Sequence, residues 1–312
     1  MPLNPDMRVF LDKAKAAGAV EISTLTPQQA RLSTHATLDL IGEINKSVSI
    51  THLYMTGPTA DLPLEIFTPP GVGPFNALVW FHGGGWVVNF LSHSHSHLTE
   101  LATRTNSVII AVNYQKAPEH KFPIPHDDCY AALEWTFQNA NKLNIDPTKV
   151  GVGGDSAGGN LASGVAIRAR DENKISLNYQ LLLYPCNGLD FETISYKECA
   201  TGYGLTRSDM KWFWEKYLNG GQDLTNPYAV PLSCSDLKGV APAIIATVEF
   251  DVLRDDGVNY AKVLTESGVP VVYKDFPGLI HGCYSFSGVA PSALVLRDFF
   301  AESVNGLLQK DS

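Results

Sequence analysis

One serine in this chain stands between glycines, in the pentapeptide Gly154-Asp155-Ser156-Ala157-Gly158. An apolar run at 150–153 precedes it and a helix-like stretch follows at 157–170, which predicts a strand, a sharp turn and a helix. A turn of this kind strains the backbone at Ser156, and it brings the strand and the helix so close to Gly154 and Gly158 that only small residues fit there. The serine also lies at a helix N-terminus, where developing negative charge is stabilised. This pattern is typical of the nucleophile in acyl transfer.

A second glycine run, His82-Gly83-Gly84-Gly85, follows the strand-like segment 77–81. Attack on an ester carbonyl puts negative charge on its oxygen, and each preorganised N–H donor aimed at that oxygen contributes about 2.7–4 kcal/mol. Glycines allow backbone N–H groups to turn outward and a substrate to approach. We therefore predict an oxyanion hole formed by the N–H groups of Gly83, Gly84 and Ala157.

A serine hydroxyl is a weak nucleophile and needs a base, which in turn needs a carboxylate to orient it. The order along the chain should be serine, acid, histidine. The apolar segment 243–248 runs into Glu249 and Asp251, and we predict that Asp251 is the acid because it stands at the end of the strand. Asp255 and Asp256 remain as competitors, although the first turn of a helix more often uses acids to stabilise its dipole. Glu249 is a further competitor on the same side of the strand, one step deeper toward the sheet.

The base follows from the same order. The chain has nine histidines, but after Asp251 there is only His281, in the glycine-bracketed loop 276–282. We predict a catalytic triad of Ser156, Asp251 and His281 that hydrolyses an ester through an acyl-enzyme intermediate.

These motifs resemble those of the hormone-sensitive-lipase-like esterases, the bacterial family IV of the α/β-hydrolase superfamily. Besides 82–86 and the serine pentapeptide, the segment 113–123 is similar to the family's Tyr-Arg-Leu-Ala-Pro-Glu motif, and 251–257 is similar to its Asp-Pro-Leu-Arg-Asp-Glu motif. The resemblance covers most of the chain. In two places the sequence departs from it: Gln115-Lys116 replaces Arg-Leu, and Val252 replaces a proline, which leaves the loop after the acid less rigid.

The resemblance implies a serine carboxylesterase for short-to-medium acyl esters, a small-molecule substrate and the same triad. It also implies a helical cap over the serine, and it makes a homodimer plausible. Some relatives have lost the histidine and act as hormone receptors, so the presence of His281 favours an enzyme. Two alternatives remain: an amidase or peptidase of the same fold, and a catalytically silent ligand-binding relative.

The pattern of apolar segments predicts an α/β fold with a mostly parallel, eight-stranded sheet flanked by helices. The expected strands lie near 47–56, 62–68, 77–82, 108–114, 149–155, 178–185, 243–250 and 269–275, and the main helices at 127–143, 157–170, 255–267 and 290–308. We divide the chain into an N-terminal helical cap segment (1–45), the first part of the hydrolase core (46–186), a cap insertion (187–240) and the second part of the core (241–312). The aromatic cluster of the insertion, Trp212, Phe213, Trp214 and Tyr217, is expected to pack within the cap rather than line the acyl pocket.

Composition excludes several functions. The 312 residues carry a net charge of −9 without a basic stripe, which argues against a nucleic-acid partner. No run of 18 apolar residues predicts a membrane span, and the first residues have neither the basic nor the apolar region of a secretory signal. The five cysteines form no C-x-x-C pair, which suits reduced thiols. We therefore expect a cytoplasmic protein.

No cofactor is expected, because the glycines at 151, 153 and 154 match neither a dinucleotide-binding nor a phosphate-loop motif. The alternating His93, His95 and His97 raise the question of a metal. No glutamate stands between them in an H-E-x-x-H pattern, so we predict a solvated helix start and no metal site.

Overall fold

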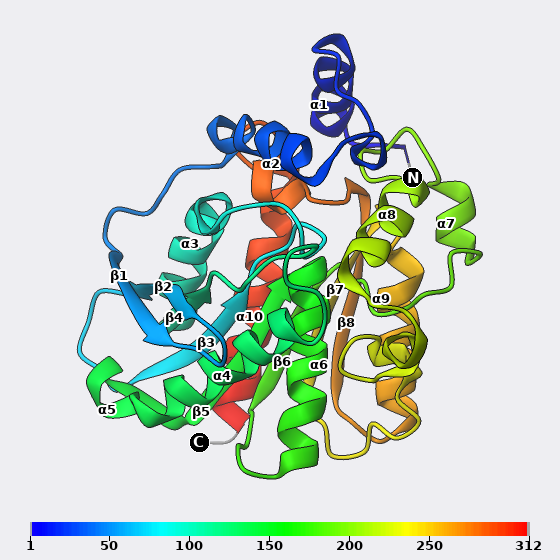
Figure 1. Ribbon diagram of the computed structural model, residues 1–312. Helices are drawn as coiled ribbons and strands as arrows, with labels where there is room; N and C mark the ends of the chain where they lie inside the picture. Colours follow the sequence, from blue (N-terminus) through cyan, green and yellow to red (C-terminus); the bar gives the residue numbers. More distant parts are fainter. Residues whose placement is uncertain (1, 311–312) are drawn as a thin grey trace.

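The computed structural model describes residues 2–310, so the outermost residues of the predicted segments 1–45 and 241–312 lie outside it. Eight strands form one sheet in the order β1-β2-β4-β3-β5-β6-β7-β8 (Figure 1). β1 and β2 pair antiparallel, as do β2 and β4, and the remaining pairs are parallel, which confirms the predicted mostly parallel sheet. The strands are β1 (Ser49–Thr56), β2 (Asp61–Thr68), β3 (Phe75–Phe81), β4 (Ser107–Val112), β5 (Ile145–Asp155), β6 (Tyr179–Leu183), β7 (Ala243–Phe250) and β8 (Val271–Ile280).

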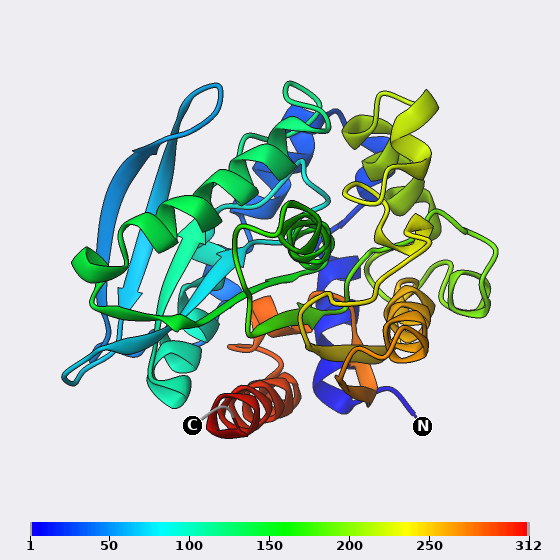
Figure 2. The same cartoon turned by 90° about the horizontal axis from the view of Figure 1, so that it is seen from below.

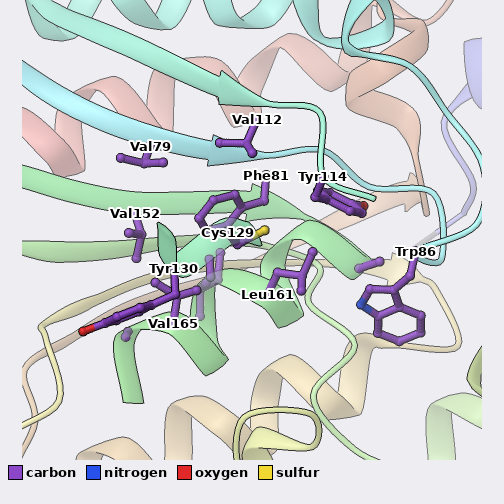
Figure 3. Packing of buried hydrophobic residues seen from close by; sticks show 14 of the residues in the cluster. Val79, Phe81, Trp86, Val112, Tyr114, Cys129, Tyr130, Val152, Leu161 and Val165 are labelled. Atoms are coloured by element: carbon purple, nitrogen blue, oxygen red, sulfur yellow. The ribbon is translucent and has the colours of Figure 1, made fainter. Parts of the chain in front are cut away.

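Helices cover both faces of the sheet (Figure 2). They are α3 (His95–Thr105), α4 (Ile124–Gln138), α5 (Ala140–Leu143), α6 (Ala157–Glu172), α9 (Arg254–Glu266) and α10 (Val295–Lys310). Because strand side chains alternate between faces, Val79 and Phe81 of β3 pack with α4 and α6, as Figure 3 shows. Leu78 and Trp80 point to the opposite face and pack with α3 and α10. The central strands are buried on both faces, which explains their continuous apolar sequences.

Two groups of helices lie outside these layers, at the end of the sheet where the parallel strands finish (Figure 1). The N-terminal group is α1 (Pro5–Ala16), η1 (Ile22–Thr24), α2 (Pro27–His35) and η2 (Leu38–Leu40), and the insertion contributes α7 (Ile194–Glu198), α8 (Arg207–Tyr217), η4 (Gly221–Thr225) and η5 (Pro231–Ser233). A hydrogen bond of 2.8 Å from the Ser23 N–H to the Asp209 carboxylate joins the two groups. No helix among residues 2–310 is both long and apolar enough to cross a membrane.

Several elements differ from the sequence-based expectations in their bounds; β5, expected from 149, begins at Ile145. β8 was expected to end near 275, but after a register shift against β7 it continues to Ile280. The expected helix 290–308 begins with a 3-10 turn (η7, Pro291–Leu294) and becomes α-helical at Val295. The expected helix 127–143 begins earlier, at Ile124, and breaks at Asn139 into α4 and α5. In each case the middle of the element was right and its boundary was wrong.

Candidate active site

Ser156 occupies the turn between β5 and α6, as predicted. Its backbone lies at φ 55° and ψ −119°, a conformation that is strained for a residue with a side chain. Strand β6 holds this backbone in place, because the Ser156 N–H donates to the carbonyl of Leu183, the last residue of β6, at 2.8 Å. A β-carbon on Gly158 would collide with the Phe81 carbonyl, and one on Gly154 would collide with Gly158, so the close packing accounts for both glycines.

The three predicted triad residues meet at the carboxyl ends of the strands. His281 follows β8, and its Nε2 lies 2.9 Å from Ser156 Oγ, although 125 residues separate the two in sequence. Its Nδ1 lies 2.7 Å from Oδ2 of Asp251, which follows β7. Asp251 is 1% exposed, and its other oxygen accepts the Leu253 N–H at 2.9 Å, which holds the carboxylate in place. The structure therefore brings hydroxyl, imidazole and carboxylate into one hydrogen-bonded row.

The other three candidate acids bind backbone groups instead. Glu249 accepts the N–H of Gly278 at 2.7 Å. Asp255 accepts the N–H of Ser195 at 2.8 Å, and Asp256 accepts that of Gly188 at 3.0 Å. Both of these donors belong to the insertion, so the two aspartates fasten it to the start of α9.

The structure corrects one member of the predicted oxyanion hole. The N–H of Gly83 donates to Asp155 Oδ1 at 2.9 Å, so it is not free to bind a substrate oxygen. Gly84 and Gly85 follow with φ values of +109° and +57°, and both line the cavity at Ser156. Among the described residues, the N–H groups of Gly84, Gly85 and Ala157 donate to no acceptor. The three available donors are therefore Gly84, Gly85 and Ala157. The third glycine of the run was missed because the path of the loop cannot be read from its composition.

Neighbouring aromatic groups hold the segment Gly83-Gly84-Gly85, the glycine loop, in place. The ring of His82 stacks on Tyr114 with centroids 4.5 Å apart, and its Nδ1 lies 2.6 Å from the Gly83 carbonyl oxygen. The Tyr114 hydroxyl donates to the His82 carbonyl at 2.8 Å. Burial lowers the pKa of His82 well below its usual value, so this ring stays neutral. Trp86, which follows Gly85, stacks on Tyr217 of α8 with ring centroids 4.2 Å apart.

A cavity of about 670 Å³ opens onto Ser156 and His281. Its walls come from the N-terminal group, the insertion and the hydrolase core together, and its apolar side chains include Phe10, Leu205, Met210, Phe213, Ile280 and Phe286. Phe213 thus lines the cavity, contrary to the expectation for the aromatic cluster, whereas Trp214 and Tyr217 are buried in packing as expected. Such a cavity suits a small substrate with an apolar part.

The expectation of a solvated histidine run is wrong. His93 and His97 are buried, and the structure ties the run to three different neighbours. His93 Nε2 lies 3.0 Å from the Thr34 carbonyl oxygen of α2, and His95 Nε2 lies 2.7 Å from the Glu65 carboxylate of β2. His97 stacks on Tyr284 at 4.6 Å. Among residues 2–310 no group of three or more histidine, cysteine or acidic side chains is placed to hold a metal ion.

A serine, an aspartate and a histidine at the carboxyl ends of the parallel strands β5, β7 and β8, beside free N–H groups, define an α/β-hydrolase. A family model described as the alpha/beta hydrolase fold matches residues 78–285, and the chain belongs to this family, in its hormone-sensitive-lipase-like branch.

Several known proteins that resemble the chain are esterases. Carboxylesterase NlhH of Mycobacterium tuberculosis is 37% identical over 238 residues, which are 75% of this chain and 74% of the relative. An arylesterase of Saccharolobus solfataricus is 32% identical over 288 residues, 90% of this chain and 92% of the relative. Among solved structures, an ester hydrolase from the metagenome of Lake Arreo superimposes with a TM-score of 0.94 at 32% identity, covering 98% of this chain and 99% of the other.

Proposed function

We propose that Ser156, His281 and Asp251 hydrolyse carboxylic esters through an acyl-enzyme intermediate. The observation that carries the proposal is the continuous row of contacts, 2.9 Å from Ser156 Oγ to His281 Nε2 and 2.7 Å from His281 Nδ1 to Asp251 Oδ2. In this row Asp251 accepts the Nδ1–H, which leaves Nε2 as an acceptor for the serine proton. The buried carboxylate stabilises the imidazolium that forms when that proton is taken.

The reaction then follows from the positions of these groups. As Ser156 Oγ attacks the ester carbonyl carbon, its proton passes to His281, and the carbonyl oxygen becomes an oxyanion bound by the N–H groups of Gly84, Gly85 and Ala157. Collapse of the tetrahedral intermediate breaks the bond to the alkoxy group, which leaves as an alcohol with the proton from His281. In the second half His281 takes a proton from water, the hydroxide attacks the acyl-serine, and the acid departs as Ser156 regains its proton.

The chain is a serine ester hydrolase, and the names of its relatives, which include an ethyl acetate hydrolase of Pseudomonas putida, favour this reading over an amidase, a peptidase or a silent binding protein. We propose short-to-medium acyl esters as substrates. The segments 1–45 and 187–240 would act together as the cap that closes over them, since both contribute walls to the cavity.

We also propose that the protein forms a homodimer and works in the cytoplasm. β8 is an edge strand of the sheet, and its Val272 and Tyr273 are 37% and 39% exposed, so this edge could pair with a second copy. All five cysteines are free thiols, which suits a reducing compartment. Light scattering during size-exclusion chromatography would test the dimer, and fractionation of the source cells would test the location.

The proposed function is tested by hydrolysis of p-nitrophenyl acetate and butyrate by the wild type and by Ser156→Ala. We expect the wild type to turn over both esters and the variant to lose nearly all activity, because among residues 2–310 only Ser156 offers a nucleophile in contact with His281. Equal turnover by the two proteins would contradict the proposal. Matched p-nitroanilides test the amidase alternative, and we expect their hydrolysis to be much slower than that of the esters.

A further inference from the structure

Asp155 is a buried carboxyl group beside the nucleophile that the proposed reaction does not use. It ends β5, is 5% exposed and lies at the wall of the cavity next to Ser156. Burial raises its pKa to about 6, against the opposing effects of the Gly83 N–H and of nearby His281. Above this pH the group is a carboxylate, and removing a carboxylate from water this completely is unfavourable unless a specific interaction offsets it.

The interaction is with the glycine loop. Asp155 Oδ1 accepts the Gly83 N–H at 2.9 Å, across 72 residues of sequence. The Asp155 carboxylate also packs directly against the α-carbon of Gly83, so closely that a β-carbon on Gly83 would collide with it. On its other side, the Gly83 carbonyl oxygen lies 2.6 Å from His82 Nδ1. The Gly83 residue is therefore held by both its N–H and its carbonyl oxygen, directly before the two glycines whose N–H groups are free.

We propose that Asp155 is a positioning residue, which holds the Gly83 N–H and thereby aims the N–H groups of Gly84 and Gly85 at the oxyanion formed on Ser156. Asp155 and Ser156 are adjacent on the same strained turn, so the carboxylate fixes the glycine loop relative to the nucleophile itself. Oxyanion stabilisation depends on such preorganisation, since a misplacement of about 1 Å can cost about 100-fold in rate. The inference rests on the proposed function and explains why an aspartate precedes the serine.

The test uses two ligands of equal size. An alkyl trifluoromethyl ketone forms a tetrahedral adduct with Ser156 and places an oxyanion in the hole, whereas the corresponding trifluoromethyl alcohol binds the cavity without forming an adduct. Inhibition constants are measured at pH 8 for the wild type, Asp155→Asn and Asp155→Ala. We expect the ratio of the ketone constant to the alcohol constant to rise about 100-fold in Asp155→Ala. In Asp155→Asn it rises about 10-fold, because the amide oxygen still accepts the Gly83 N–H but as a weaker, uncharged acceptor.

Asp256→Asn is the matched control. It also removes a buried carboxyl group near the triad, but that group accepts the N–H of Gly188 in the insertion and not one in the glycine loop. Its ratio should equal that of the wild type. Wild-type ratios in both Asp155 variants would overturn the inference alone, and so would equal losses of ketone and alcohol binding, which indicate general damage. If the wild type itself did not prefer the ketone, the proposed function and the inference would both be wrong.

Discussion

The ring of Phe213, in α8 of the insertion, lies directly against the backbone of Gly85 in the glycine loop. A β-carbon on Gly85 would collide with this ring, and the residue also has a φ of +57°, which a side chain disfavours. The adjacent Trp86 stacks on Tyr217 of the same helix. The insertion therefore packs against the glycine loop and also lines the cavity, and changes in α8 should affect catalysis as well as substrate fit.

Gly85→Ala should lower kcat/KM about 100-fold, because displacement of this N–H removes one oxyanion donor. The double variant with Phe213→Ala should recover part of the loss, since the colliding ring is gone. Gly306→Ala in α10 is the control, because a β-carbon there meets no neighbouring atom within 4 Å. Steady-state hydrolysis of p-nitrophenyl butyrate measures all three, and a fully active Gly85→Ala enzyme would contradict the corrected oxyanion hole.

Asp251→Asn should lower kcat about 10,000-fold, as expected when the acid that fixes the histidine tautomer is replaced by an amide. Asp255→Asn serves as the comparison, because Asp255 binds the Ser195 N–H and not His281. It should retain most of the activity. A near-normal rate for Asp251→Asn would instead assign the orienting role to another carboxylate.

Arg31 of α2 fastens the N-terminal group to the core. Its Nε donates to the Val87 carbonyl at 2.9 Å, its Nη2 donates to the Ala117 carbonyl at 2.9 Å, and the guanidinium forms two bonds to the Glu119 carboxylate. Since Glu119 is 55% exposed, Glu119→Gln should cost less than about 1 kcal/mol in the free energy of unfolding. Arg31→Ala should cost about 1–3 kcal/mol, because it also leaves two carbonyl groups unpaired. Urea unfolding compares the variants, and equal losses would show that the ion pair alone matters.

His97 predicts a dependence of stability on pH. Burial lowers its pKa to about 3, and neither ring nitrogen has a hydrogen-bond partner among the described residues. In the unfolded chain the ring binds a proton below about pH 6.5, whereas in the folded protein it stays neutral down to about pH 3. Its contribution to stability is therefore complete above pH 6.5 and decreases as the pH falls toward 3.

His97→Phe should remove this dependence of stability on pH, because phenylalanine does not titrate. As the pH falls from about 6 to about 4, the free energy of unfolding of the wild type should decrease relative to that of the variant by about 1.4 kcal/mol for each pH unit. Urea unfolding at several pH values gives the difference directly, with His52→Phe as control because His52 is 69% exposed. Parallel stability curves for the wild type and His97→Phe would contradict the argument.

The sequence was sufficient to predict the sheet and to select three residues, Ser156, Asp251 and His281, that the structure brings into contact. Apolar runs set the strands, and parallel strands bring their carboxyl ends to one edge, so Ser156, Asp251 and His281 could be matched by order alone. The direction of individual N–H groups could not be obtained in this way. Gly83, Gly84 and Gly85 are identical in composition, and only the bond from Gly83 to Asp155 shows which of them are free.

Tertiary packing also decided what the local pattern left open. The alternating histidines are typical of a polar helix start, yet α2, β2 and the segment after His281 each supply a neighbour that contacts one of them. Likewise, the aromatic residues of α8 share one short segment, but the geometry of the helix sends Phe213 to the cavity and Trp214 to Trp86. Contacts between segments far apart in sequence set both outcomes.

The central claim, that Ser156 is the nucleophile activated by His281, is tested most directly by intact-protein mass spectrometry after treatment with a fluorophosphonate. The wild type should gain the mass of one phosphonyl group and lose its esterase activity in step. His281→Ala should be labelled far more slowly, and Ser156→Ala should keep its original mass. Labelling of Ser156→Ala at the wild-type rate and stoichiometry would contradict the assignment.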